Sequence, residues 1–297
     1  MAVEHEIRQH QILRDRAETL SVTFYDDGIV TDPGTVTIGI EDEAGDTIVA
    51  SSIATSGSGS DARTYDLAGQ SDLNVLIVTW TSATYGDFTD RVEAVGDHLF
   101  TIREARSFDG NALISPSDYS SEDIEKARAR ITDDFEHAMG VSHIPRYKRV
   151  DGLFGNDTTR LFLPDIHVNL IRTVEYRGGD ETDWTAFDSD EMDDLSITDS
   201  GVLKRRTDGD WEEGTEYRVT YEYGYDAPPL PVKRAALRLL TSYLGATHSS
   251  WDPRATSMST EAGVISLATP GRAGSIFGLP EVDAIIHRYS ERVVRVG

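Results

Sequence analysis

The first candidate for chemistry in this sequence is a histidine-rich stretch near its start. His5 and Glu6 are followed by His10, a composition similar to the two-histidine zinc motif of metalloproteases. That motif places its histidines four residues apart on one helix face, whereas His5 and His10 are five apart and would point in different directions. The spacing therefore does not predict a metal site.

A second candidate is the acidic segment 180–194, whose composition resembles a calcium-binding loop. A calcium loop needs a glycine at its sharp bend and a glutamate at its closing position, and this segment has neither in register. We interpret it as a solvated acidic loop, and whether it binds a cation stays open. The carboxylates concerned are Asp188, Asp190, Asp193 and Asp194.

Motifs for enzymatic chemistry are absent from the sequence. It has no Gly-x-Ser-x-Gly elbow, no P-loop and no paired-glycine dinucleotide turn. The Gly/Ser stretch 56–60 has no strand and helix around it, so it indicates a flexible loop tip and not a phosphate cradle. The absence of cysteine excludes disulfides, thiolate zinc sites and thiol nucleophiles. We expect a protein that is not an enzyme and that uses no cofactor or metal.

Charge and hydrophobicity limit the possible partners. The formal net charge is −24 and the pI is near 4.6, which argues against binding nucleic acid by neutralising phosphates. Hydrophobic residues make up 38% of the chain, as in ordinary globular proteins. The longest apolar runs, such as 74–80, are too short to span a bilayer, and residues 1–12 lack the apolar core of a secretory signal. We therefore expect neither membrane association nor export.

The first third of the chain predicts an all-β domain. After an N-terminal arm at residues 1–18, apolar and polar residues alternate over 19–105 and turn residues separate about six or seven short strands. That number and spacing are typical of an immunoglobulin-like sandwich, although the cysteine pair of antibody domains is missing.

The remaining residues, 106–297, predict an α+β domain in which helices enclose a β-rich insertion at 160–224. A helix is expected at 121–139, where Ser120 and Asp123 form a capping signal and Gly140 ends the helix. A second helix is expected at 231–244, starting at a proline. Its apolar stripe, the expected helical core, consists of Val232, Ala235, Ala236, Leu239, Leu240 and Tyr243.

The C-terminal part is expected to order on a partner. Residues 248–275 are rich in Ser, Thr, Gly and Ala and are longer than an ordinary connection. Residues 279–297 then predict a short helix and an alternating arm that could add to a partner's sheet. The apolar face of the helix either docks on a partner or closes the subunit's own core. The expected interface residues are Val282, Ile285, Ile286, Tyr289, Arg292 and Arg295.

Two motifs in the second half resemble the head-tail connector (adaptor) proteins of long-tailed phages. In the stretch 221–240 a strand ends in Gly-Tyr, a Pro-Pro turn follows, and an Ala/Leu-rich helix begins. The stretch 277–289 is similar to that family's C-terminal Gly-x-Pro-x-Val-Asp ending with a tyrosine. Both occur in the expected order after the helix at 121–139. The resemblance covers 109–297 and leaves the N-terminal domain as an addition.

The resemblance implies a structural role in a virion. Members of that family form rings, usually of twelve copies, between the portal and the stopper or tail-completion protein, and DNA passes through the lumen. It also implies assembly in the host cytoplasm and a C-terminal segment that holds the portal. The net charge of −24 agrees with a ring that does not bind DNA tightly.

A secreted or surface adhesion protein that binds carbohydrate is the alternative. An immunoglobulin-like module would suit that role, and Tyr85 and Phe88 in a turn-rich segment are the candidate contacts. The role requires export, and no signal for export is present. The two aromatic residues would also be the glycan contacts if the sandwich alone bound host surfaces within a virion, but ordinary loop packing explains them better.

Overall fold

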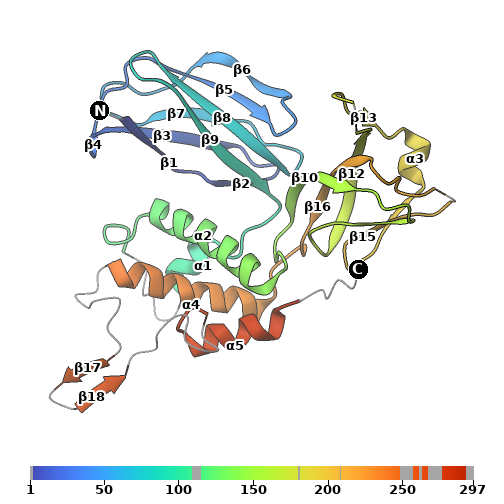
Figure 1. Ribbon diagram of the computed structural model, residues 1–297. Helices are drawn as coiled ribbons and strands as arrows, with labels where there is room; N and C mark the ends of the chain where they lie inside the picture. Colours follow the sequence, from blue (N-terminus) through green and yellow to red (C-terminus); the bar gives the residue numbers. More distant parts are fainter. Residues whose placement is uncertain are drawn as a thin grey trace. The chain divides into compact units, whose positions relative to one another are not determined.

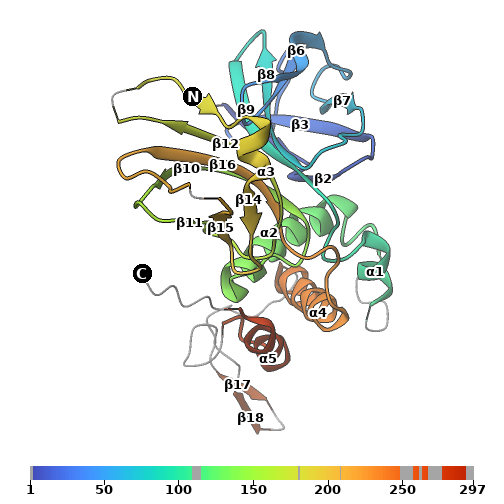
Figure 2. The ribbon, with the colours of Figure 1, turned by 90° about the vertical axis from the view of Figure 1, so that its right-hand side faces the viewer.

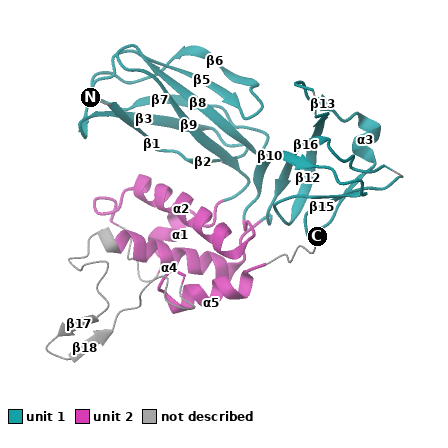
Figure 3. Ribbon diagram, in the orientation of Figure 1, with its two compact units in different colours: residues 1–97, 144–226 teal, residues 98–143, 227–297 magenta. Residues whose placement is uncertain are grey.

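A computed structural model describes residues 3–108, 115–179, 181–207, 209–247, 257–260, 263–266 and 276–291 (Figure 1). The fold is α+β, and the chain forms two compact units (Figure 3). The strand-rich unit contains residues 1–97 and 144–226, and the helical unit contains residues 98–143 and 227–297. The expected domain 106–297 therefore contributes to both units. No described helix is long and apolar enough to cross a membrane.

Two sheets form the N-terminal part of the strand-rich unit. One contains β1 (Val3–Ile7), β3 (Glu18–Asp26), β4 (Ile29–Val30) and β7 (Arg63–Leu67). The other has the order β2–β9–β8–β5–β6, made of β2 (Gln11–Leu13), β9 (Gly86–Val95), β8 (Asn74–Ser82), β5 (Val36–Asp42) and β6 (Thr47–Ala54). All neighbouring strands are antiparallel except β2 and β9.

The two sheets share one apolar core. Alternate residues of β3, which are Leu20, Val22 and Phe24, are buried, as are Ile38 and Ile40 of β5. The period-2 pattern in the sequence places these side chains on one face of each strand, and that face meets the other sheet. A two-sheet sandwich follows from this arrangement, while its immunoglobulin-like topology stays a prediction.

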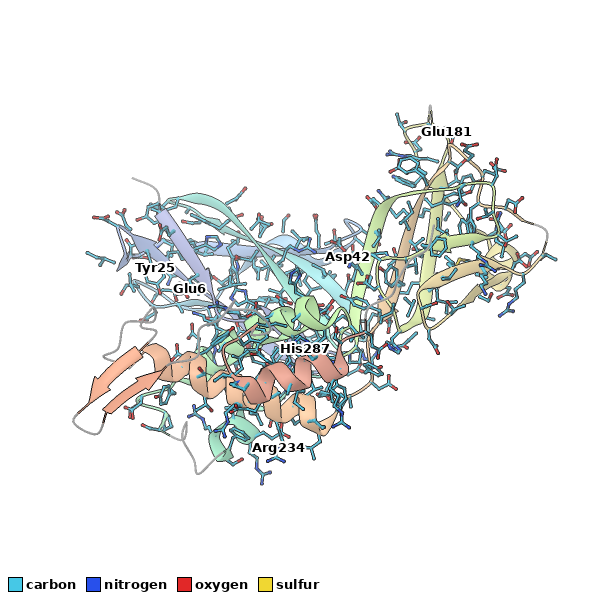
Figure 4. The ribbon with its side chains drawn as sticks, turned by 60° about the horizontal axis from the view of Figure 1, so that its bottom comes forward. Glu6, Tyr25, Asp42, Glu181, Arg234 and His287 are labelled. Atoms are coloured by element: carbon cyan, nitrogen blue, oxygen red, sulfur yellow. The ribbon has the colours of Figure 1, made fainter. Side chains whose placement is uncertain are left out.

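Residues 1–18 are not a separate arm, contrary to the sequence-based expectation. Strand β1 pairs with β3, and β2 pairs with β9. Ile7 and Ile12 are buried in the sandwich core, so two isolated apolar residues in a charged stretch are enough to fix it there. Across the β1–β3 pair, the Tyr25 hydroxyl donates to Glu6 at 3.3 Å (Figure 4).

A tight hairpin joins β3 to β4. Asp27 and Gly28 have φ values of 53° and 76°, which is the conformation that a two-residue hairpin turn requires. The hairpin ends in two apolar residues that the sandwich does not cover, because Ile29 is 72% exposed and Val30 is 44% exposed. The hairpin therefore presents apolar surface to solvent.

The β-rich insertion belongs to the strand-rich unit and begins earlier than expected. Strand β10 (Arg146–Phe154) opens a sheet with the order β10–β16–β12–β13, where β16 is Glu216–Tyr223, β12 is Val168–Arg177 and β13 is Thr185–Ala186. A three-stranded sheet, β11 (Arg160–Phe162), β15 (Val202–Arg205) and β14 (Leu195–Ile197), shares its core. The sequence of β10 is rich in charged residues and does not predict a strand. The segment is a strand because it pairs with β16.

The insertion is fastened to the sandwich within the same unit. The Arg146 guanidinium donates two hydrogen bonds to Glu93, at 2.7 and 2.6 Å. Beside this pair, Tyr147 packs with Leu73 and Val75. The bidentate ion pair and the apolar contact beside it together hold β10 against the sandwich.

The helical unit contains α1 (Ile102–Ser107), α2 (Ser121–Met139), α4 (Leu230–Thr247) and α5 (Pro280–Tyr289). Helices α4 and α5 lie side by side (Figure 2), and α2 packs against both. Within 248–275, expected as one long loop, β17 (Ser257–Thr260) and β18 (Gly263–Ser266) form an antiparallel hairpin. The rest of that segment lies outside the described residues.

Candidate docking site on the helical unit

Helix α4 forms the centre of the helical unit. Pro231 stands at its start, where the missing N–H costs nothing, and no glycine or proline interrupts it before Gly245. The expected stripe is buried: Val232, Ala235, Ala236, Leu239 and Leu240 are at most 5% exposed. Burial of this face against α2 and α5 stabilises the helix more than its propensity does.

Tyr243 is the exception in that stripe, because its ring lies at the edge of the core. Its hydroxyl donates to Asp134 at 3.0 Å, and the Arg130 guanidinium lies over the ring at 4.9 Å from the centroid. Burial, together with the negative charge of Asp134, raises the pKa of Tyr243 to about 12. The phenol therefore stays protonated far above its ordinary range.

The raised pKa of Tyr243 predicts how the free energy of unfolding changes at alkaline pH. The unfolded phenol loses its proton near 10.0 and the folded one near 12, so the stabilisation is present below pH 10.0 and is lost as the pH rises toward 12. In Tyr243→Phe we expect no loss of stability from this group at alkaline pH. At neutral pH we expect the variant to be less stable by about 1 kcal/mol, because the hydrogen bond to Asp134 is missing. Unfolding curves measured across this range test it, and identical alkaline slopes in both proteins would contradict it.

Helix α5 closes the core of its own subunit with part of its apolar face. Val282 and Ile286 are 0% and 1% exposed, so within the subunit they have no surface to offer a partner. Ile285 and Tyr289 are half-buried. The sequence leaves docking and core closure as alternatives, and burial assigns Val282 and Ile286 to the core. Arg292 and Arg295 lie outside the described residues.

Asp283 fixes the entry into α5. Its side chain is buried, and its Oδ1 accepts hydrogen bonds from the backbone N–H groups of Ile276 and Phe277, at 3.1 and 2.9 Å. The Phe277 ring then packs on Phe135 of α2, with 5.8 Å between ring centroids. The Gly-x-Pro-x-Val-Asp pattern thus has a physical meaning: its aspartate holds the turn that begins the helix.

The end of α5 is fixed to the end of α2. The Glu291 N–H donates to the Met139 carbonyl at 2.9 Å, and a Cβ added at Gly140 would lie 3.0 Å from the Glu291 carbonyl oxygen. Gly140 also has a φ of 74°, so its conformation favours glycine, and a side chain there would press on the Glu291 carbonyl. The His143 and Tyr289 rings meet beside this junction, with 6.2 Å between their centroids.

A shallow apolar groove lies between the start of α4 and α5. Its volume is about 400 Å³. Leu230 is 67% exposed beside it, and Arg238 pairs with Glu281 across it at 3.3 Å. The lining residues are Phe108, Leu230, Pro231, Arg234, Ala235, Arg238, Glu281 and Ile285. Of the expected interface residues that the structure describes, only Ile285 lines this groove.

Basic residues of α4 border the groove. Helix α4 has three basic residues and no acidic one, and Arg234 extends from it into solvent (Figure 4). No ion pair involves Arg234 among the residues that the structure describes. Sequence reasoning misses Leu230, Arg234 and Arg238, although one signal for them exists: they fall outside the apolar stripe of the same helix.

The other candidates from the sequence do not assemble into sites. His5 lies on strand β1, not on a helix, and its Nε2 contacts Asp90 at 2.9 Å, while His10 is exposed. In the acidic segment, Asp188 caps α3 (Ser189–Asp193) and Asp194 accepts hydrogen bonds from Thr207. In the part of the chain that is described, no group of three or more His, Asp or Glu side chains could hold a metal ion.

The two aromatic residues considered for carbohydrate binding have structural partners. Phe88 packs against the sandwich core and contacts Phe24, with 5.3 Å between ring centroids. The Tyr85 hydroxyl lies 3.3 Å from the Thr31 hydroxyl. Packing within the strand-rich unit therefore accounts for both side chains.

Comparisons with known proteins give similarity to solved structures only. No family model matches this sequence, and no curated protein matches it. A chain of the neck of an empty GTA particle, solved with C6 symmetry, is 15% identical, with a TM-score of 0.42 over 66% of this chain and 89% of that one. A chain of the virion of a native gene transfer agent particle is 15% identical, with a TM-score of 0.43 over 67% and 93%.

A superoxide reductase from Ignicoccus hospitalis is 11% identical, with a TM-score of 0.23 over 32% of this chain and 79% of that one. Because these TM-scores are low, the function of this chain has to be argued from its own residues.

Proposed function

We propose that this chain is a non-catalytic structural subunit of a phage-like virion, a head-to-tail adaptor that forms a ring beneath the portal. The ring joins the capsid to the tail and lets DNA pass. In this proposal it has twelve copies, the number usual in the family that the motifs resemble, and it meets the stopper or tail-completion protein on its other side.

One observation supports the proposal most: both motifs shared with adaptor proteins hold the helical unit together. The Pro-Pro turn leads into α4, whose stripe is buried. The aspartate of the second motif, Asp283, fixes the entry to α5 through Ile276 and Phe277. Helix α4 of the first motif and the whole second motif thus belong to one compact unit, as expected when a motif specifies a fold.

Charge supports the proposal as well. A ring around a moving duplex must not bind phosphates tightly, because neutralised phosphates hold DNA with an affinity that rises with each contact. A chain with a net charge of −24 repels the duplex instead. Arg234 of α4, which is exposed and has no ion pair among the described residues, is then available for a protein partner.

The test is direct observation of the ring. The purified full-length chain, alone and mixed with the portal protein of its own genome, is examined by native mass spectrometry and by negative-stain imaging. We expect closed rings that bind the portal. A chain that stays monomeric in both samples and is absent from purified particles overturns the proposal, and binding to glycans in an array would favour the adhesion alternative.

A further inference from the structure

The groove on the helical unit and the hairpin β3–β4 both expose apolar side chains to solvent. Leu230 is 67% exposed at the groove and Ile29 is 72% exposed at the hairpin. Each of these surfaces also carries charge, but of opposite sign. Arg234 lines the groove with no ion pair among the described residues, and Arg238 there pairs with Glu281 at 3.3 Å, whereas Asp26 and Asp27 precede Ile29 in the hairpin.

The hairpin matches the groove better than the other exposed apolar residues do. The carboxylate of Asp27 is exposed, and Asp26 Oδ1 is buried with no hydrogen-bond partner among the described residues. Phe154 is also 65% exposed, but two acidic residues near it already bind other groups of the chain. Asp151 binds Arg218 at 2.6 Å, and Asp157 accepts from the Glu213 N–H at 2.8 Å.

Two further exposed apolar residues lack a matching charge. Leu170 is 50% exposed, and its neighbour Arg172 has the same sign as the groove. Ile53 is 40% exposed and lies in an uncharged stretch of β6. Opposite charge steers two surfaces together and fixes their register, so the hairpin is the surface of this chain that complements the groove.

We propose that the hairpin β3–β4 of one copy docks into the groove between α4 and α5 of the next copy. Ile29 covers Leu230 and Ile285, and Asp27 pairs with Arg234. The two surfaces are different, so the contact is heterologous, and contacts of this type repeated around an axis close into a ring. The inference rests on the proposed function, because it names the lateral contact of the proposed ring.

The groove has a size suited to such a contact. Its volume of about 400 Å³ lies at the lower end of the range for binding pockets, roughly 300–1,000 Å³. It accommodates a few side chains at a hairpin tip and not a whole helix. The rigid two-residue turn at Asp27 and Gly28 presents Ile29 with little loss of conformational freedom on docking.

Cysteine cross-linking tests the contact without background, because the chain contains no cysteine. The full-length variants Ile29→Cys and Leu230→Cys are prepared singly and oxidised under assembly conditions. Mixed together, they are expected to give a disulfide-linked dimer, which neither gives alone. The double variant is expected to give a ladder that ends at the ring. The matched control combines Phe154→Cys with Leu230→Cys and is expected to stay uncross-linked.

A double-mutant cycle tests the charge pair. Asp27→Asn keeps a residue that tolerates the positive φ of this turn, and Arg234→Gln keeps the length of the side chain. Each single variant is expected to raise the concentration at which half the chains form rings by about tenfold. The double variant is expected to raise that concentration no further than either single variant does. Arg288→Gln, on an exposed position of α5, is the control and is expected to change nothing.

The outcomes separate the two proposals. Rings without cross-linking between positions 29 and 230, or independent effects of the two charge variants, overturn the docking contact and leave the adaptor proposal intact. Absence of rings in the unmodified chain, with and without the portal, overturns both. Cross-linking by Ile29→Cys alone would show a symmetric contact instead and overturns the heterologous one.

Discussion

A chain that ends at Glu291 is expected to fold normally and to lose the joining of heads to tails. The resemblance to adaptor proteins implies a C-terminal segment that holds the portal, and we propose that this segment is residues 292–297, which contain Arg292 and Arg295. Helix α5 keeps its anchor in this variant, because the Glu291 N–H still binds the Met139 carbonyl. We expect unfolding free energies within about 0.5 kcal/mol of the full chain. Joined particles should fall at least about tenfold, the effect of losing roughly 1.4 kcal/mol of contact.

A second truncation, after Gly278, distinguishes the loss of portal binding from the loss of folding. It removes α5, and the loss of Val282 and Ile286 from the core costs about 1.5–3 kcal/mol for each buried side chain. Both truncations should therefore prevent joining, but only this one should lower the stability of the helical unit. Counting tailed particles by electron microscopy, beside denaturant unfolding of each chain, tests the pair. Normal joining by the chain ending at Glu291 would contradict the assigned role of the arm.

The helices can be predicted closely from sequence because their signals are local. The helix expected at 121–139 is present as Ser121–Met139, since Ser120 and Asp123 form a reciprocal capping box and Gly140 takes the left-handed conformation. The helix expected at 231–244 begins one residue earlier and extends to Thr247. Caps and breakers act within one turn of a helix, so no tertiary information is needed to read them.

Strands and partners are harder to predict because they depend on pairing. Strands β1 and β10 are rich in charge, and each becomes a strand only through its neighbour, β3 and β16 respectively. The apolar face of α5 is visible in the sequence, but whether a partner or the same subunit covers it depends on residues far away in the chain. Burial of Val282 and Ile286 decides this for part of the face only.

The groove itself cannot be predicted from sequence. It exists because Phe108, Leu230 and Ile285, which come from three distant segments, lie around one hollow. Ile285 belongs to the apolar face of α5 that the sequence shows, but Phe108 and Leu230 lie at the ends of α1 and α4, where no periodicity marks them. By contrast Asp283 is marked by the motif, but its role as an acceptor for two backbone N–H groups follows only from the structure.

Replacing Asp283 with alanine is expected to destabilise the helical unit by about 3 kcal/mol. The carboxylate is 4% exposed and accepts two backbone hydrogen bonds, and a hydrogen bond to a charged group contributes roughly 1.5–3 kcal/mol. Without it, the N–H groups of Ile276 and Phe277 lose their acceptor. Phe277 is then no longer held against Phe135, so the start of α5 should fray. Denaturant unfolding followed by circular dichroism measures the change.

Two further variants test whether the loss of stability comes from removing the buried acceptor and not from removing a charge. Asp283→Asn keeps one acceptor oxygen in place, so it should lose less stability than alanine does. Glu281→Ala removes a carboxylate one position before Val282, where the pair with Arg238 is exposed to solvent and contributes about 0–1 kcal/mol. If Asp283→Ala were no more destabilising than Glu281→Ala, the turn at 276–279 would not depend on the aspartate. In that case the second adaptor-like motif would lose its structural meaning, and the strongest support for the proposed function would go with it.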